Sequence, residues 1–256
     1  MIYITGDTHA LMDVRKLDLF FNREVTLRSV TKDDKLIILG DVALFWDGSW
    51  NDYHVKKYLQ SLPCSVLWID GNHENFNIID KLPNVSMFGG LVNDTDGIIH
   101  LKRGEVYTIE NKRFFTFGGA ASVDRAYRVE NRTWWAHEMP TTEDYQNGLT
   151  NLAKHDFHVN YILTHTVPTF IAHRFTDKID SYDLPIMDYF AEISNKTTYD
   201  KWYFGHWHRD ISLENSEFVG MYNLVERLHV DKEHEPSIEE LDERSNTDDG
   251  FDIGDE

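Results

Sequence analysis

Cysteine is almost absent from the sequence, and the single Cys64 excludes an intrachain disulfide and any cysteine-rich zinc site. Long apolar runs are also missing, and the longest ones are far too short to span a bilayer. No signal-peptide pattern follows Met1. These features predict a reduced, cytoplasmic protein without membrane association, in which Cys64 packs as a small apolar side chain.

Positive charge is scarce as well, with 25 basic residues against 44 acidic ones and a net charge of −19. Residues 231–256 carry −10 of this charge, so the first 230 residues carry only −9. We interpret residues 231–256 as a solvated, mobile tail, with docking on a basic partner as the alternative. General nucleic-acid binding is not expected, although a nucleotide could enter a site whose bound cations supply positive charge.

What the sequence does contain is a recurring pattern of short apolar runs. Each run ends at Gly, Asn or Thr beside a polar residue that can bind metal. Such runs are typical of strands buried on both faces. The five runs are Ile2 to Ile4, Leu36 to Leu39, Val66 to Ile69, Tyr161 to Leu163 and Trp202 to Phe204. Two further strands are predicted over residues 113–117 and 221–228.

Amphipathic stretches long enough to be helices lie between these runs, over residues 13–27, 51–62 and 141–154. Thr141 and Asp144 have the spacing of a capping box at the start of the third helix. Strands that alternate with helices predict an α/β domain with largely parallel pairing. No repeat or low-complexity linker precedes residue 231, so one domain over residues 1–230 with an acidic tail over 231–256 is expected.

Polar side chains that can bind metal follow the five runs. Functional groups of α/β sheets gather at the carboxyl ends of the strands, so these side chains are expected to converge. They offer nitrogen and oxygen without sulfur, which suits manganese, iron, zinc, nickel or cobalt, with manganese favoured. The set is Asp7, His9, Asp41, Asn72, His73, His165, His206 and His208.

The spacing within this set suggests how metal is held. Two pairs of these residues are two positions apart in the sequence: Asp7 with His9, and His206 with His208. In an extended segment both side chains of a pair point the same way, so each pair could bind one ion. Asp41, at a sharp Gly-Asp turn, is the natural bridge between two ions. Two ions about 3.5–4 Å apart hold a shared hydroxide at neutral pH and clamp the attacking and leaving oxygens of a phosphate ester.

The ordered motifs G-D-x-H, G-D, G-N-H-E, T-H and G-H-x-H resemble those of the calcineurin-like metallophosphoesterase superfamily and cover residues 6–208. The resemblance implies a four-layer sandwich of two mixed β-sheets flanked by helices, with the metal site at the strand carboxyl ends. It implies that His73 binds no metal but contacts the phosphate and assists departure of the leaving group. The implied ligands are Asp7, His9 and His208 for one metal, Asn72, His165 and His206 for the other, and Asp41 as the bridge.

The substrate is less clear from the motifs. After Asp41 the chain lacks the D-R-G continuation of serine/threonine protein phosphatases, and Ala10 stands where those enzymes carry Gly. We therefore favour a phosphate mono- or diester of a nucleotide or small metabolite over a phosphoprotein. A non-catalytic scaffold is the alternative from another class, but no expected ligand is missing.

Residues 120–140 are dense in Arg, Trp and acidic residues, and we interpret them as a segment that folds over the metal centre. Arg125 or Arg128 would then hold a substrate phosphate through paired hydrogen bonds. The alternative is a surface loop whose arginines pair with its own acids. Phe45, Trp46 and Phe76 directly follow two of the motifs, and either stack on a base at the pocket mouth or pack in the core.

Overall fold

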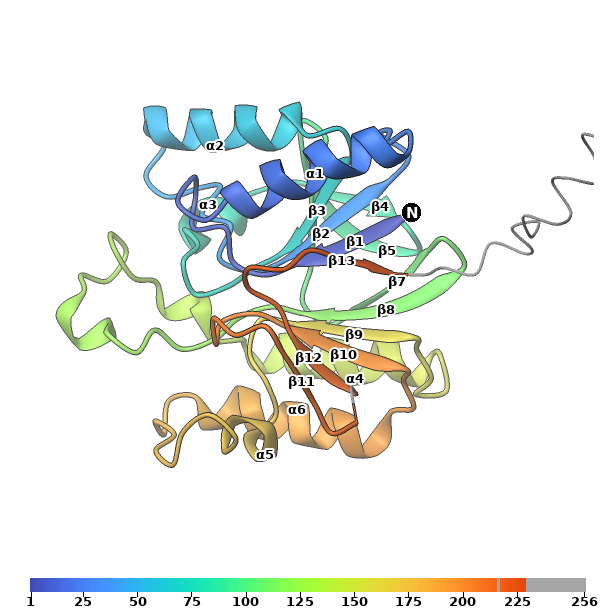
Figure 1. The fold of residues 1–256 in the computed structure, drawn as a ribbon. Helices are drawn as coiled ribbons and strands as arrows, with labels where there is room; N and C mark the ends of the chain where they lie inside the picture. Colours follow the sequence, from blue (N-terminus) through green and yellow to red (C-terminus); the bar gives the residue numbers. More distant parts are fainter. Residues whose placement is uncertain (216, 229–256) are drawn as a thin grey trace, which may run out of the picture.

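In the computed structural model, which describes residues 1–215 and 217–228, two β-sheets are stacked on one another. Helices cover both outer faces (Figure 1). The first sheet has the order β13 (Glu226–Leu228), β1 (Ile2–Thr5), β2 (Lys35–Leu39), β3 (Ser65–Ile69), β6 (Ile98–Leu101), β5 (Gly90–Thr95) and β4 (Asn84–Met87). The second has the order β11 (Ile211–Leu213), β12 (Phe218–Gly220), β10 (Lys201–Phe204), β9 (Tyr161–Thr164), β8 (Lys112–Phe117) and β7 (Glu105–Ile109).

Both sheets are mixed, with a parallel centre and antiparallel edges. Strands β1, β2, β3 and β6 pair in parallel, as do β8, β9, β10 and β12. Antiparallel strands occupy the edges, such as β13 beside β1 and β7 beside β8. The prediction of largely parallel pairing is confirmed for the centre of each sheet, where the strands that precede the motifs lie.

Two helices, α1 (Arg15–Leu27) and α2 (Trp50–Ser61), cover the first sheet (Figure 1). On the far side, α4 (Thr142–Ala153), α5 (Thr169–Ala172) and α6 (Leu184–Lys196) cover the second sheet. The short α3 (Phe76–Ile79) follows β3, and two 3-10 helices, η1 (Arg125–Tyr127) and η2 (Ala136–Glu138), lie between β8 and α4. The predicted four-layer α/β sandwich is confirmed.

Three apolar cores separate the four layers. Between the sheets, Ile2 and Ile4 of β1 pack with Leu163 of β9, while Tyr3 points to the opposite face and packs with Phe21 of α1. This alternation follows from the two-residue repeat of a strand. A third core joins the second sheet to α4, α5 and α6. Cys64 lies buried in the core beneath α2, as expected.

The capping box before α4 is also confirmed. The side-chain oxygen of Thr141 accepts a hydrogen bond from the backbone N–H of Asp144, and the Asp144 carboxylate accepts one from the backbone of Thr141. Along the described ranges 1–215 and 217–228, no helix combines the length and the apolar character that crossing a bilayer demands.

The strand predicted over residues 221–228 is wrong for most of its length, because β13 begins only at Glu226. The carboxylate of Asp210 accepts hydrogen bonds from the backbone N–H groups of Tyr222, Asn223 and Leu224 at 2.8–3.1 Å. Those groups are therefore held in a turn and cannot join a ladder. The tail predicted over residues 231–256 lies outside the described residues, so its boundary with a domain over 1–230 stays a prediction.

Candidate metal centre

The predicted site residues lie where the central parallel strands of both sheets end. Asp7 follows β1, Asp41 follows β2, and Asn72 and His73 follow β3. From the second sheet, His165 follows β9, and His206 and His208 follow β10. Because the sheets are stacked, these ends meet along one seam, and the structure brings all eight predicted side chains together there. Three of their groupings place possible ligand atoms within 4.8 Å of one another: Asp7, His9 and His208; His9, Asp41 and His73; and Asp7, Asp41 and His165.

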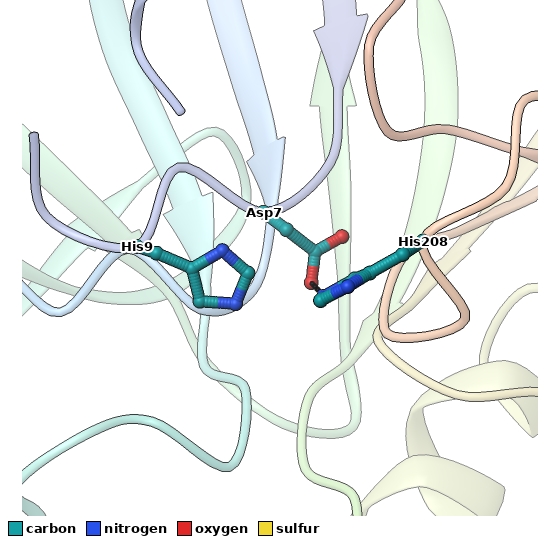
Figure 2. Close-up of side chains that lie close together, drawn as sticks. All are labelled: Asp7, His9 and His208. Atoms are coloured by element: carbon teal, nitrogen blue, oxygen red, sulfur yellow. Dashed lines mark ion pairs between the residues drawn. The ribbon is translucent and has the colours of Figure 1, made fainter. Parts of the chain in front are cut away.

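The first grouping is the triad that the resemblance assigns to one metal. Figure 2 shows the side chains of Asp7 and His9, from the loop after β1, and of His208, from the loop after β10, pointing toward one another, with Nε2 of His208 lying 3.8 Å from Oδ1 of Asp7. His9 Nδ1 lies 2.7 Å from a carboxylate oxygen of Asp13, which orients the imidazole. The remaining nitrogen, Nε2, lies 3.4 Å from Oδ2 of Asp41. Asp41 therefore borders this group as well.

A second cluster forms around His165, which is fully buried. Its Nδ1 lies 2.7 Å from the carbonyl oxygen of Leu39, so Nδ1 carries the proton and Nε2 is left for other partners. Nε2 lies 3.2 Å from Oδ1 of Asn72 and 3.2 Å from Oδ1 of Asp41. The His206 ring lies 5.1 Å from the His165 ring. Asp41 thus presents one oxygen to His165 and the other to His9.

The backbone of the site is not extended, which corrects one step of the sequence reasoning. Five candidate residues have a left-handed φ: Asp7 at 28°, His9 at 43°, Asp41 at 49°, His206 at 62° and His208 at 48°. Such a conformation costs about 1–3 kcal/mol per non-glycine residue, so the surrounding structure must hold it. His206 and His208 accordingly point to different groups, although they are two residues apart.

Two glycines of the motifs allow the ligands to approach one another. A Cβ atom on Gly71 would lie 2.1 Å from Oδ1 of Asp41, and one on Gly40 would lie 2.2 Å from Nδ1 of His165. Gly40 also has a φ of +89°, a region that glycine adopts without steric cost. The glycines of G-D and G-N-H-E are therefore required for packing around the carboxylate and imidazole.

Residues that are not proposed as ligands support the site. Buried Glu74 accepts hydrogen bonds from the backbone N–H groups of Val42 at 2.7 Å and Ala43 at 3.3 Å, which fixes the turn after Asp41. The side-chain amide of Asn72 donates to Ser122, whose hydroxyl donates to Glu138 at 2.6 Å. This series of hydrogen bonds leaves the side-chain oxygen of Asn72 facing His165. Sequence reasoning missed Ser122 and Glu138, although both lie in the flagged segment 120–140.

Electrostatics within the cluster favour a bound cation. Burial raises the pKa of Asp7 to about 7, because a carboxylate deprived of water is a poor anion. Burial disfavours the charged form of His165, yet Asp41 and Asp7 raise the pKa of its imidazole to about 9. Burial, with His165 nearby, lowers the pKa of His206 to about 3, so this ring is neutral and able to ligate. The buried carboxylates beside the neutral imidazole of His206 are a donor set that fits a divalent cation, whose binding would displace the proton from Nε2 of His165.

A cavity of about 570 Å³ opens over these groups and is lined by Asp41, Asn72, His73 and Arg128 among others. Arg128 Nε lies 2.7 Å from a carboxylate oxygen of Asp124. Arg125 is not among the lining residues; its guanidinium lies 2.9 Å from Asp180 and over the Tyr182 ring. The segment flagged in the sequence therefore brings one of its two predicted arginines to the cavity.

A family model described as calcineurin-like phosphoesterase matches residues 1–210, and the chain belongs to this family. No curated protein matches the chain. Among solved structures, a Staphylococcus aureus chain described as a candidate 5′-nucleotidase in complex with α-ketoglutarate is similar, with a TM-score of 0.48 and 10% identity. The match covers 86% of this chain and 48% of that one, so this chain spans about half the length of that protein.

Proposed function

We propose that the chain hydrolyses phosphate mono- or diesters of nucleotides or small metabolites at a centre of two divalent metal ions, with manganese favoured. The observation that carries this proposal is Asp41, whose two oxygens face His165 and His9 respectively, as a bridging carboxylate does. When bound, two such ions lower the pKa of a shared water and offset charge on the phosphoryl oxygens. The proposed ligands are Asp7, His9 and His208 on one side, Asn72, His165 and His206 on the other, and Asp41 between them.

His73 is proposed to donate a proton to the leaving oxygen. Its backbone N–H donates to Asp41 at 2.8 Å, and its ring lines the cavity. Burial, with a smaller contribution from Arg128, lowers the pKa of the His73 imidazole, while Asp41 opposes this shift. The negative charge of a phosphate ester beside the ring favours the protonated form, which general-acid catalysis needs.

Arg128 is proposed to hold a non-bridging phosphate oxygen, because it lines the cavity with His73. Arg128→Ala is expected to lower kcat/KM about tenfold, mainly through KM, since a charged hydrogen bond is worth about 1.5–3 kcal/mol. Arg125→Ala is the matched comparison, and we expect a smaller loss because Arg125 does not line the cavity. Steady-state kinetics measure both, and unchanged efficiency in both variants would contradict a role for either arginine.

Metal dependence tests the proposed function directly. Protein stripped with a chelator is expected to show no turnover of p-nitrophenyl phosphate or bis-p-nitrophenyl phosphate, and added manganese is expected to restore it. Metal analysis should then give nearly two ions per chain, and the preferred ester separates a monoesterase from a diesterase. A non-catalytic scaffold would remain inactive with manganese, iron, zinc, nickel and cobalt while circular dichroism shows it folded, and it need not retain two ions.

A further inference from the structure

A second, smaller pocket of about 250 Å³ adjoins the metal centre. His9 and His73 line it, together with Met12, Ala43 and Trp46 among others. His73 also lines the 570 Å³ cavity. The imidazole proposed to protonate the leaving oxygen is therefore shared by the two hollows.

The two hollows differ in chemistry. The larger cavity is lined by four carboxylates and two basic side chains, Arg128 and Lys178. The smaller one is walled largely by apolar groups, and the carboxylate of Asp52 at its edge already accepts three backbone hydrogen bonds, from residues 46, 47 and 48 at 2.7–3.2 Å. An uncharged, apolar group therefore fits the smaller hollow, whereas a charged group fits the larger one.

The aromatic wall of the smaller pocket is held in place before any ligand binds. Asp52 anchors the backbone at Trp46, and the side-chain amide of Asn75 donates to the Trp46 carbonyl oxygen at 2.7 Å. The Trp46 ring stacks near the His73 ring, with centroids 6.2 Å apart and planes at 21°, and its other contact is the edge of buried Trp135. Such preorganisation reduces the entropic cost of binding.

We propose that this pocket binds the alcohol portion of the substrate and selects phosphate esters with an apolar, aromatic leaving group. The inference rests on the proposed function, because that function places the leaving oxygen beside His73. The same imidazole lines the apolar pocket together with Trp46 and Met12. Of the aromatic residues flagged after the motifs, Trp46 lines this pocket, whereas Phe76 is buried under Arg103 and Phe45 packs against the core beneath α2.

Calorimetric binding to the manganese-loaded protein tests the pocket without turnover. Benzylphosphonate is expected to bind at least about tenfold more tightly than methylphosphonate, since the two share the phosphonate and differ in the apolar ring. Trp46→Ala should remove most of this preference. Trp50→Ala is the matched control, because Trp50 is 70% exposed, stacks on Tyr53 and does not line the pocket, and it should keep the preference.

Met12→Ala is a second test of the pocket in case the Trp46 variant fails to fold. Met12 is 78% exposed, so its replacement should not disturb folding, and a partial loss of the preference is expected. Equal affinity for the two phosphonates in the wild-type protein, or a preference that survives in both Trp46→Ala and Met12→Ala, would overturn the inference. Turnover of benzyl phosphate and glycerol phosphate is measured in parallel. A protein that prefers benzylphosphonate but cleaves neither these monoesters nor bis-p-nitrophenyl phosphate would keep the pocket as an apolar binding site and refute the proposed hydrolysis.

Discussion

Replacing Asp41 by asparagine is expected to lower kcat for p-nitrophenyl phosphate by at least about 10³-fold, which corresponds to the several kcal/mol that metal-centred charge stabilisation supplies. The amide has the size of the carboxylate but lacks its charge, and an NH₂ group replaces one oxygen. Either His165 or His9 would then face a donor where an acceptor stood. Metal analysis is expected to fall from nearly two ions per chain to one or fewer.

The matched control for this experiment is Asp33→Asn, which removes an exposed carboxylate just before β2 and should leave turnover and metal content unchanged. Thermal unfolding of the metal-free proteins establishes that Asp41→Asn is still folded. If a folded Asp41→Asn variant kept two ions and wild-type turnover, Asp41 would not be the bridge, and the proposal of a dinuclear centre would lose its principal support.

The second large effect is expected from His73→Asn, which should lower kcat by about 10²–10³-fold while leaving the metal content largely intact. The loss should depend on the leaving group, because p-nitrophenolate departs without a proton whereas an alkoxide does not. Benzyl phosphate is therefore expected to show a larger loss than p-nitrophenyl phosphate. A metal ligand would not produce this split.

The alternative role for His73 is that of a metal ligand. Its imidazole belongs to one of the three groupings of possible ligand atoms, together with His9 and Asp41. Equal loss of metal and of turnover in His73→Asn would make it a ligand or a structural residue. His208→Asn provides the comparison, because a proposed ligand should lose metal and turnover together.

The sequence predicted the strands that are buried on both faces, because their apolar runs are continuous. It did not predict β4 and β5, where polar residues such as Asn84, Asn93 and Asp94 interrupt any apolar run. Strand β5 mixes buried and exposed residues and pairs antiparallel with β4 and β6. The sequence likewise did not predict β6, a buried strand that pairs in parallel with β3, because His100 interrupts its short apolar run. The sequence signal therefore depends on an uninterrupted apolar run.

The candidate site followed the same logic. The residues that converge there could be predicted because each stands shortly after a strand, so that a local motif marks it. The contact between Asn72 and Ser122 joins residues 50 positions apart in the chain and depends on how the segment between β8 and α4 folds, which no local pattern encodes. The left-handed backbone at Asp7 and His208 was not predicted either, because Asp and His adopt it more often than most residues but only at a small fraction of positions.

The seam between the sheets gives the proposed ions a mechanical role in addition to a chemical one. Asp7 and Asn72 belong to the first sheet, whereas His208 and His165 belong to the second, so each ion would join the two sheets as a removable cross-link. A ligand that binds only the folded state stabilises it by about 2.7 kcal/mol at a hundredfold excess over its Kd. In a chain with one cysteine and no disulfide of its own, the supply of metal would therefore set how firmly its two halves stay docked.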